Sequence, residues 1–156
     1  MISRYQINEH EYLELSDDVL RVFASHVQTF GRSEAGGILL GCVYPGSHVV
    51  VQKVTVPAYP DRAGLCFFDR SRKRAQRIVE REWKNSSGVC MYLGEWHTHS
   101  EPHPDPSPRD RKMIRNMLRQ TKMEIDSLFL VIVGTRSNWD GVENGERLQR
   151  LRPQDG

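Results

Sequence analysis

The 156-residue sequence predicts an α/β (α+β) domain in which a mixed central β-sheet is flanked by helices. Two patterns predict this class. Segments whose apolar residues recur every three or four positions alternate along the chain with segments rich in Val, Ile and Leu. The length suits one domain, residues 1–156, and it is sufficient to bury a core without disulfides.

The first predicted helix covers residues 15–31, LSDDVLRVFASHVQTFG. Ser16 can cap its amino terminus, and the two acids that follow suit the positive end of the helix dipole. Apolar residues recur at helical spacing on one face, from Val19 to Phe30. Gly31 can end the helix.

Two β-rich segments follow this helix, at residues 36–43 and 48–56. Pro45 and Gly46 lie between them, so the pair predicts a hairpin. Residues 57–68 show no helical period, and we expect an irregular or extended segment there.

The remainder of the chain continues the alternation of helices and strands. It predicts, in order, a helix at 70–84, a strand at 89–99, a Pro-rich loop at 100–106, a helix from Ser107 to about Gln120, a strand at 127–134 and an edge strand at 146–153. The strand at 127–134, SLFLVIVG, is apolar throughout, which is typical of a strand buried on both faces.

Composition excludes several classes of protein. The net charge is only +2, and no apolar run approaches the ~20 residues of a membrane helix. Cys42, Cys66 and Cys90 are odd in number and form no CxxC pair, which disfavours a disulfide framework. The polar amino terminus has no apolar signal core, so we expect a soluble protein of the cytoplasm with no membrane partner.

Cations cluster on the second predicted helix, at 70–84. They are Arg70, Arg72, Lys73, Arg74, Arg77 and Arg81. We interpret the cluster as a solvated helix face, and the alternative is a docking face for an acidic partner or a nucleic acid. No nucleic-acid reading module accompanies it, so no nucleic-acid partner is expected.

The stretch GEWHTHSEPHPDPSPRD, residues 94–110, concentrates side chains that can bind a metal. His97 and His99 end a predicted strand. Residues two apart on a strand point to the same face, so both imidazoles can reach one ion. Zinc accepts such nitrogen ligands, and the position before a loop favours a site.

The third ligand has three candidates. His103 and Asp105 have suitable chemistry, but prolines bracket both of them in a stiff, exposed loop. Asp110 is the better candidate, because it lies in the first turn of a helix that faces the histidines. A capping box with Ser107 at the helix start would by itself also explain Ser107 and Asp110.

Two histidines and one carboxylate leave a coordination position for water, which is the composition of a catalytic zinc site. A general base must then accept a proton. Glu34 lies in SEAGGILLG, where Gly36 and Gly37 allow a close approach of the backbone to other elements. Glu95 lies on the strand face of the two histidines, where it can be the base, orient a histidine or form a salt bridge. The residues by themselves leave the choice between Glu34 and Glu95 open.

The spacing from His97 to Asp110 is H-x-H, seven residues, S, two residues, D. This pattern resembles the JAMM motif of the JAB1/MPN-type metalloproteases. SEAGGILLG resembles the acidic segment that lies upstream of that motif, and the two matches occur in the family's order. The order of strands and helices is similar to that family over most of the chain.

The resemblance implies a cytidine-deaminase-like core and a zinc isopeptidase with one Zn²⁺ per chain. It implies that His97, His99 and Asp110 bind the zinc, that Glu34 is the general base and that Ser107 stabilises the oxyanion. Glu95 is left near the site or the substrate, without an assigned role.

The short chain and GEWHTH look most similar to bacterial JAB proteins. One branch of these accompanies ubiquitin-like E1 and E2 enzymes in cyclic-oligonucleotide antiphage defence, and removes an E2-like protein from a nucleotidyltransferase. The resemblance therefore implies a ubiquitin-like partner with an extended C-terminal tail. The alternatives are a hydrolase that processes a sulfur-carrier protein and a non-catalytic MPN scaffold.

Overall fold

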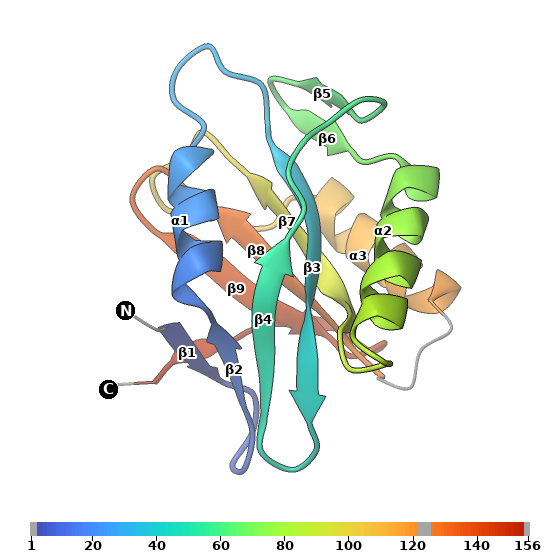
Figure 1. Ribbon diagram of the computed structural model, residues 1–156. Coiled ribbons are helices and arrows are strands. Elements are labelled where there is room, and N and C mark those ends of the chain that lie inside the picture. The colour runs from blue at the N-terminus through green and yellow to red at the C-terminus, as the bar shows by residue number, and fades with distance from the viewer. Residues whose placement is uncertain (1–2, 122–125, 155–156) are drawn as a thin grey trace.

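The computed structural model describes residues 3–121 and 126–154, and the statements below refer to these residues. Three helices and eleven strands follow one another along them (Figure 1). The elements are β1 (Ser3–Gln6), β2 (Tyr12–Leu15), α1 (Asp17–Ser25), β3 (Gly36–Tyr44), β4 (His48–Val54), β5 (Arg62–Gly64), β6 (Phe67–Asp69), α2 (Arg72–Asn85), β7 (Met91–Thr98), α3 (Pro108–Gln120), β8 (Leu128–Val133), β9 (Asn138–Glu143), β10 (Leu148–Arg150) and β11 (Arg152–Pro153).

Nine of these strands form one mixed sheet, in the order β10-β9-β8-β7-β3-β4-β2-β1-β11. The pairs β7–β8 and β2–β4 are parallel, and the other neighbours are antiparallel. The strands β5 and β6 form a separate small hairpin. A mixed central sheet flanked by helices is the fold class that the sequence predicted, and that prediction is confirmed.

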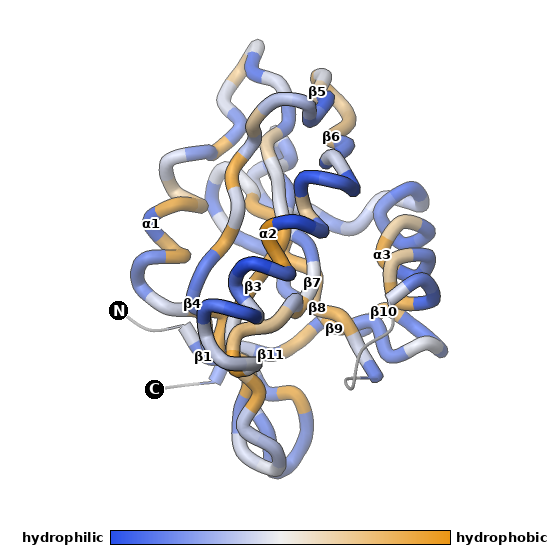
Figure 2. Tube along the Cα trace, turned by 45° about the vertical axis from the view of Figure 1, so that its right-hand side comes forward, coloured by the Kyte–Doolittle hydropathy of each residue, from blue (hydrophilic) through white to orange (hydrophobic). Residues whose placement is uncertain are grey.

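The helices cover opposite faces of the sheet, with α1 on one side and α2 and α3 on the other (Figure 1). The alternation of β8 shows why both faces are buried: Phe129, Val131 and Val133 join the core under α1, whereas Leu130 and Ile132 join the core under α3. Figure 2 shows the hydrophobic segments between the layers. The fully apolar strand predicted at 127–134 is therefore buried on both faces.

The first helix is shorter than predicted, because it ends at Ser25 rather than at Gly31. Beyond it the buried Gln28 donates its side-chain amide to the carbonyl oxygens of Arg32 and Leu65, at 2.9 and 3.0 Å. Those contacts require a loop instead of another helical turn. Phe30, placed by the sequence on the buried face, is fully exposed.

The sequence analysis missed β1, β2 and β9, which are short and carry mixed polar residues. The edge strand predicted at 146–153 is in fact two strands, β10 and β11, which lie at opposite edges of the sheet. They are separated only by Leu151, whose N–H donates to the carbonyl of Asp140 at 2.8 Å. The sheet therefore bends until its two edges meet.

No helix among the described residues is long and apolar enough to span a membrane. Cys42, Cys66 and Cys90 are all free thiols, which agrees with the prediction of a fold without disulfides.

Candidate metal centre and its cleft

His97 and His99 lie at the carboxyl end of β7, with their rings on one face and their centroids 5.1 Å apart. The strand is central, between β3 and β8, and the N–H of His99 continues the ladder by donating to the carbonyl of Val133 at 3.0 Å. Both histidines are buried at this position. The strand pairing therefore holds the two imidazoles in place.

The Pro-rich loop returns the chain to these histidines. Pro102 accepts the N–H groups of Arg136 and Ser137, at 3.1 and 2.9 Å, so the loop is fastened to the connection between β8 and β9. It ends in the predicted capping box: Asp110 N donates to Ser107 Oγ at 3.1 Å, and Ser107 N donates to Asp110 Oδ2 at 2.8 Å. The cap therefore orients the carboxylate of Asp110.

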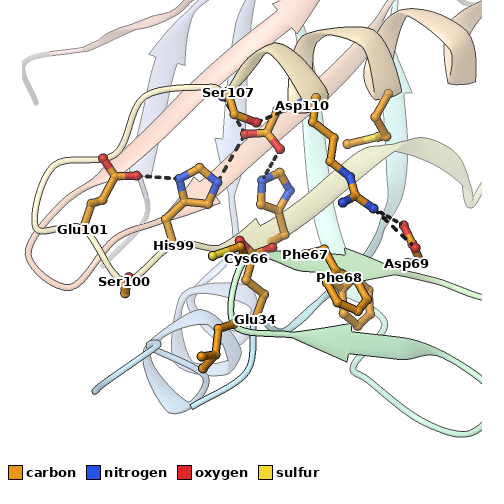
Figure 3. A pocket seen from close by; sticks show the side chains of 14 residues that line it. Glu34, Cys66, Phe67, Phe68, Asp69, His99, Ser100, Glu101, Ser107 and Asp110 are labelled. Atoms are coloured by element: carbon orange, nitrogen blue, oxygen red, sulfur yellow. Dashed lines mark hydrogen bonds and ion pairs between the residues drawn. The ribbon is translucent and has the colours of Figure 1, made fainter. Parts of the chain in front are cut away.

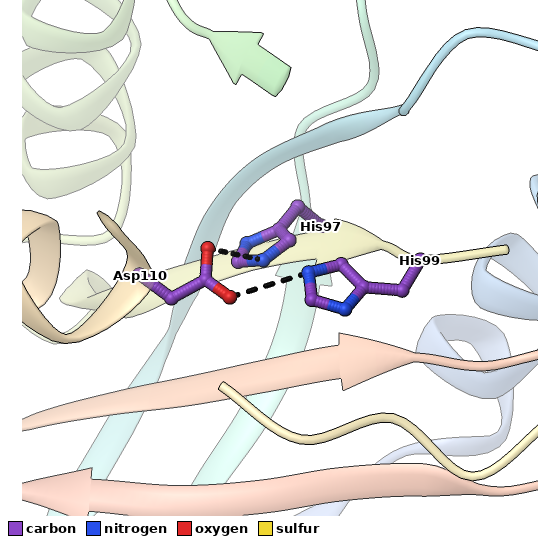
Figure 4. Close-up of side chains that lie close together, drawn as sticks. All are labelled: His97, His99 and Asp110. Carbon is purple, nitrogen blue, oxygen red and sulfur yellow. Dashed lines mark ion pairs between the residues drawn. The ribbon is translucent and has the colours of Figure 1, made fainter. Parts of the chain in front are cut away.

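His97, His99 and Asp110 converge, with ligand atoms within 4.8 Å of one another (Figure 4). Asp110 Oδ1 lies 3.0 Å from His97 Nε2, and Asp110 Oδ2 lies 3.2 Å from His99 Nε2. His97 Nε2 is buried and has no hydrogen-bond partner of acceptable geometry among the described residues. A buried nitrogen lone pair beside a second imidazole and a carboxylate fits a metal ion of the zinc type.

The charges of His99 and Asp110 stabilise each other. Burial opposes ionisation of Asp110, but the adjacent imidazoles of His97 and His99 outweigh it and lower the pKa of the carboxyl. Burial likewise opposes the charged form of His99, but the hydrogen bond to Asp110 and its charge raise the pKa of the ring. Asp110 is thus held as a carboxylate, the form that binds a cation.

Glu34 reaches the same cleft from a distant part of the chain. Gly36 lies opposite His97 in the β3–β7 pairing, and the pairing continues where Thr98 N donates to Ala35 O at 2.9 Å. Because faces alternate along a strand, Glu34 shares the face of Gly36 and hence of His97. Burial raises the pKa of Glu34, although the charges of His97 and His99 oppose the rise.

The two glycines that begin β3 make this approach possible, as the sequence predicted. A Cβ at Gly36 would lie 2.6 Å from the backbone oxygen of Trp96, and a Cβ at Gly37 would lie 2.2 Å from that of Thr55. Only glycine fits such close contacts without displacing a strand.

Glu95 lies deeper on the histidine face of β7 and is buried. Arg70 binds both of its carboxylate oxygens, at 2.7 and 3.1 Å, and Tyr92 also donates to it. Glu95 is therefore the salt-bridge partner that the sequence left as one of three alternatives. Arg70, interpreted as part of a solvated face, is largely buried, whereas Lys73 and Arg77 are exposed.

We call His97, His99 and Asp110 the metal group. His103 and Asp105, the other candidates for the third ligand, are not part of it. His103 is exposed and its Nδ1 lies 2.8 Å from Ser137 Oγ, and Asp105 is exposed. The sequence analysis missed Glu101, which it left as a loop residue. Its Oε1 lies 2.9 Å from His99 Nδ1, where it can orient the ring. An acid two residues after a candidate ligand was the available signal.

A cleft of about 250 Å³ opens over these side chains (Figure 3). The metal group and Glu34 line one side, and the β5–β6 hairpin lines the other with Cys66, Phe67 and Phe68. Arg109 joins the two sides, since it lies 3.2 Å from Asp69 and over the ring of Phe67 at 5.5 Å. The cleft is polar at the metal group and apolar under the hairpin.

Known proteins resemble this chain over most of its length. Residues 16–151 match the family described as prokaryotic homologs of the JAB domain. A CD-NTase/cGAS isopeptidase of Pseudomonas aeruginosa is 37% identical over 78% of this chain and 77% of its own. The Vibrio cholerae protein of the same name is 35% identical, over 72% and 69%.

Two more distant proteins are also similar to this chain. A probable metalloprotease of Sinorhizobium fredii is 25% identical over 80% of this chain and 77% of its own. A Desulfitobacterium hafniense protein, solved in solution, shares the fold with a TM-score of 0.57, at 17% identity over 88% of each chain. The resemblance inferred from the sequence is confirmed, and this chain belongs to the prokaryotic JAB-domain family.

Proposed function

We propose that this chain is a zinc-dependent isopeptidase that hydrolyses the bond after the C-terminal glycine of a ubiquitin-like tail. One observation carries the proposal: the ligand atoms of His97, His99 and Asp110 lie within 4.8 Å of one another, and Glu34 lines the same cleft. Membership in the JAB-domain family and the isopeptidase and metalloprotease names of the relatives support it.

His97 Nε2, His99 Nε2 and one oxygen of Asp110 are the proposed zinc ligands. When bound, the ion supplies an acidified water and polarises the scissile carbonyl. The protein holds the ligands through its strand pairing and its helix cap. Glu101 keeps His99 in the tautomer whose Nε2 is free to bind, because its carboxylate faces Nδ1.

Glu34 is the proposed general base. Its carboxylate accepts a proton from the attacking water and delivers that proton to the leaving lysine amine as the carbon–nitrogen bond breaks. Partial burial raises its pKa, which strengthens the carboxylate as a base at neutral pH.

Ser107 is the proposed oxyanion donor. Its Oγ already accepts the N–H of Asp110 at 3.1 Å, so its own hydroxyl proton remains available for another acceptor. Ser107 lines the cleft beside the metal group. A donor aimed at the developing oxyanion stabilises the transition state more than the substrate.

The proposed conjugate is a nucleotidyltransferase joined to an E2-like enzyme or a ubiquitin-like protein, in cytoplasmic antiphage defence with E1- and E2-like partners. The relatives named CD-NTase/cGAS isopeptidase support this assignment. The open cleft under β5–β6 can receive an extended tail.

The test measures zinc and cleavage separately. Purified protein should contain about one zinc per chain. Glu34→Gln should keep the zinc and lower the cleavage of a glycine–lysine isopeptide by ~10²–10⁴-fold. His103→Ala is the control and should keep both. Retained activity in Glu34→Gln, or an absence of zinc binding, would refute the proposal.

A further inference from the structure

The outer side of α3 carries cations in a continuous stripe. Arg111, Arg115 and Arg119 are four residues apart, so they stack along one face of the helix, and Lys112 lies beside them. The helix has a single acidic residue, Asp110, which belongs to the metal group. Like charges at this spacing destabilise a helix, and no acid on α3 relieves them.

A second wall makes this stripe one side of a cleft. The β9–β10 hairpin contributes Arg147 and Glu143 opposite the helix, and we call this hollow the basic cleft. The five cations that line it are Arg111, Lys112, Arg115, Arg119 and Arg147. Glu143 is the one carboxylate that lines it. It is buried and already accepts from Arg115 at 3.3 Å and from Gly145 N at 3.2 Å.

The basic cleft concentrates charge that the whole chain lacks. Its five cations and one carboxylate give an excess of four positive charges, whereas the complete sequence has a net charge of +2. The residues outside the basic cleft therefore carry a formal net charge of −2, since +2 less +4 is −2. Segregation of this kind attracts an acidic partner to one face and orients it.

The basic cleft adjoins the catalytic cleft. Arg109 lines the catalytic cleft and Arg111 lines the basic cleft, with Asp110 between them in the first turn of α3. A substrate protein held on this stripe therefore lies on the helix whose first turn carries Asp110. Figure 2 shows α3 as mostly hydrophilic on its outer side and more hydrophobic on the side that faces the rest of the chain, with β10 beside it.

The chemistry of the lining favours a polypeptide over a nucleic acid. Single-stranded nucleic acids are bound through aromatic side chains on which bases stack. The basic cleft has none: its other lining residues are Asn116 and Leu148. Guanidinium groups without aromatic neighbours fit side-chain carboxylates, because one guanidinium can donate two parallel hydrogen bonds to one carboxylate.

We propose that the basic cleft docks an acidic segment of the conjugated protein and holds it while the adjoining metal centre cleaves the isopeptide bond. The substrate class named here rests on the proposed isopeptidase function. The basic cleft itself is a feature of this chain's charge distribution, so its binding can be measured without any cleavage.

The binding experiment uses a fluorescein-labelled oligoglutamate peptide of about ten residues, with a Gly/Ser peptide and an oligothymidylate of similar length as comparisons. Arg111→Glu/Lys112→Glu/Arg119→Glu removes the stripe and spares Arg115, which supports Glu143. Lys73→Glu/Arg77→Glu/Arg81→Glu is the matched control, because it replaces one lysine and two arginines at exposed positions of α2 and so makes the same change in charge.

The wild-type chain should bind oligoglutamate, and more weakly as salt rises from ~50 to ~200 mM. The α3 variant should weaken this binding by at least ~10-fold, and the α2 control by less than ~3-fold. Equal losses in both variants, or no binding by the wild type, would overturn the proposal. Oligothymidylate binding that exceeds oligoglutamate binding and depends on the stripe would overturn it in favour of a nucleic-acid surface.

A cleavage experiment separates this proposal from the proposed function. Glycine–lysine isopeptides are compared with and without an acidic stretch on the lysine side. The acidic substrate should have a KM ~10-fold lower for the wild type, the α3 variant should lose that preference, and kcat on the neutral substrate should not change. If neither substrate is cleaved, the proposed function fails while the binding result stands independently.

Discussion

His99 is held from two sides. Asp110 Oδ2 lies 3.2 Å from its Nε2, and Glu101 Oε1 lies 2.9 Å from its Nδ1. His97 faces the same carboxylate, because Asp110 Oδ1 lies 3.0 Å from its Nε2. The two proposed ligands therefore share Asp110, and the contact of Glu101 with a ring Nδ1 is a feature of His99.

This difference predicts the effect of Glu101→Ala. The substitution should lower zinc affinity by ~10–100-fold, because the ring of His99 loses the carboxylate that sets its tautomer and orientation. Competition with a chelator measures the change. The melting temperature of the metal-free protein should stay the same, because the side chain of Glu101 is 58% exposed.

Asp105→Ala provides the control, since it removes an exposed acid from the same loop. Glu101→Gln should recover part of the affinity, because its amide oxygen can still accept from Nδ1. Zinc affinities that are equal in Glu101→Ala and the wild type would exclude this role.

At the scale of elements, the loop between α1 and β3 determines where the proposed base lies. Thr98 Oγ1 accepts the N–H of Ala35 at 2.9 Å and donates to Gln28 Oε1 at 3.3 Å. The same Gln28 binds Arg32 O and Leu65 O. One buried hydroxyl and one buried amide thus join β7 to the loop that bears Glu34 and to the β5–β6 hairpin.

Thr98→Val tests this connection. Valine has the same shape but leaves the N–H of Ala35 without its acceptor, so stability should fall by ~1–3 kcal/mol. Glu34 should be held less closely, and kcat should fall by about 10-fold with zinc content unchanged. Thermal unfolding, metal analysis and steady-state kinetics provide the measurements.

Thr98→Ser separates this effect from a loss of packing, because serine retains the hydroxyl. It should recover most of kcat. A Thr98→Val enzyme with wild-type kcat would mean that the loop holds Glu34 without this bond.

At the scale of the whole molecule, the sheet closes on itself where β9, β10 and β11 meet. Asp140 is buried there, and its Oδ1 has no hydrogen-bond partner among the described residues. Burial raises the pKa of Asp140 to about 7, although Tyr5 and Arg150 partly offset the rise. A carboxyl group at the point of closure is therefore neutral in the fold over much of the acidic range.

The sign of the pH dependence follows from that shift. Between pH ~4 and ~7 the folded protein holds a proton on Asp140 that the unfolded chain has released. The bound proton therefore stabilises the folded state. This stabilisation is complete below pH ~4 and is lost as the pH rises through about 7. Asp140→Asn should therefore be more stable than the wild type at pH 8, by ~2–4 kcal/mol.

The two proteins should have nearly equal stability at pH 4, and urea titrations at both values measure the difference. Glu143→Gln is a suitable comparison, because it neutralises another buried acid of β9 that Arg115 and Gly145 already satisfy. A difference between Asp140→Asn and the wild type that does not vary with pH would contradict the prediction.

Patterns among neighbouring residues were enough to predict parts of the fold and of the candidate site. The alternation in β7 placed His97 and His99 on one face, and the capping box placed Asp110 at the start of α3. Both depend on neighbours within a few residues. The split of 146–153 and the missed β9 depend on sheet closure, which brings together residues that are distant in the chain.

The sequence by itself determined the proposed ligand set and the helix start that presents Asp110, because short spacings encode both. The choice between Glu34 and Glu95 needed a family resemblance, and the residues alone left it open. Tertiary structure placed the two acids differently. The β3–β7 register puts Glu34 in the cleft of the metal group, and Arg70 forms an ion pair with Glu95. Strand register couples residues as far apart as Ala35 and Thr98, 63 positions, and no local pattern reports such a distance.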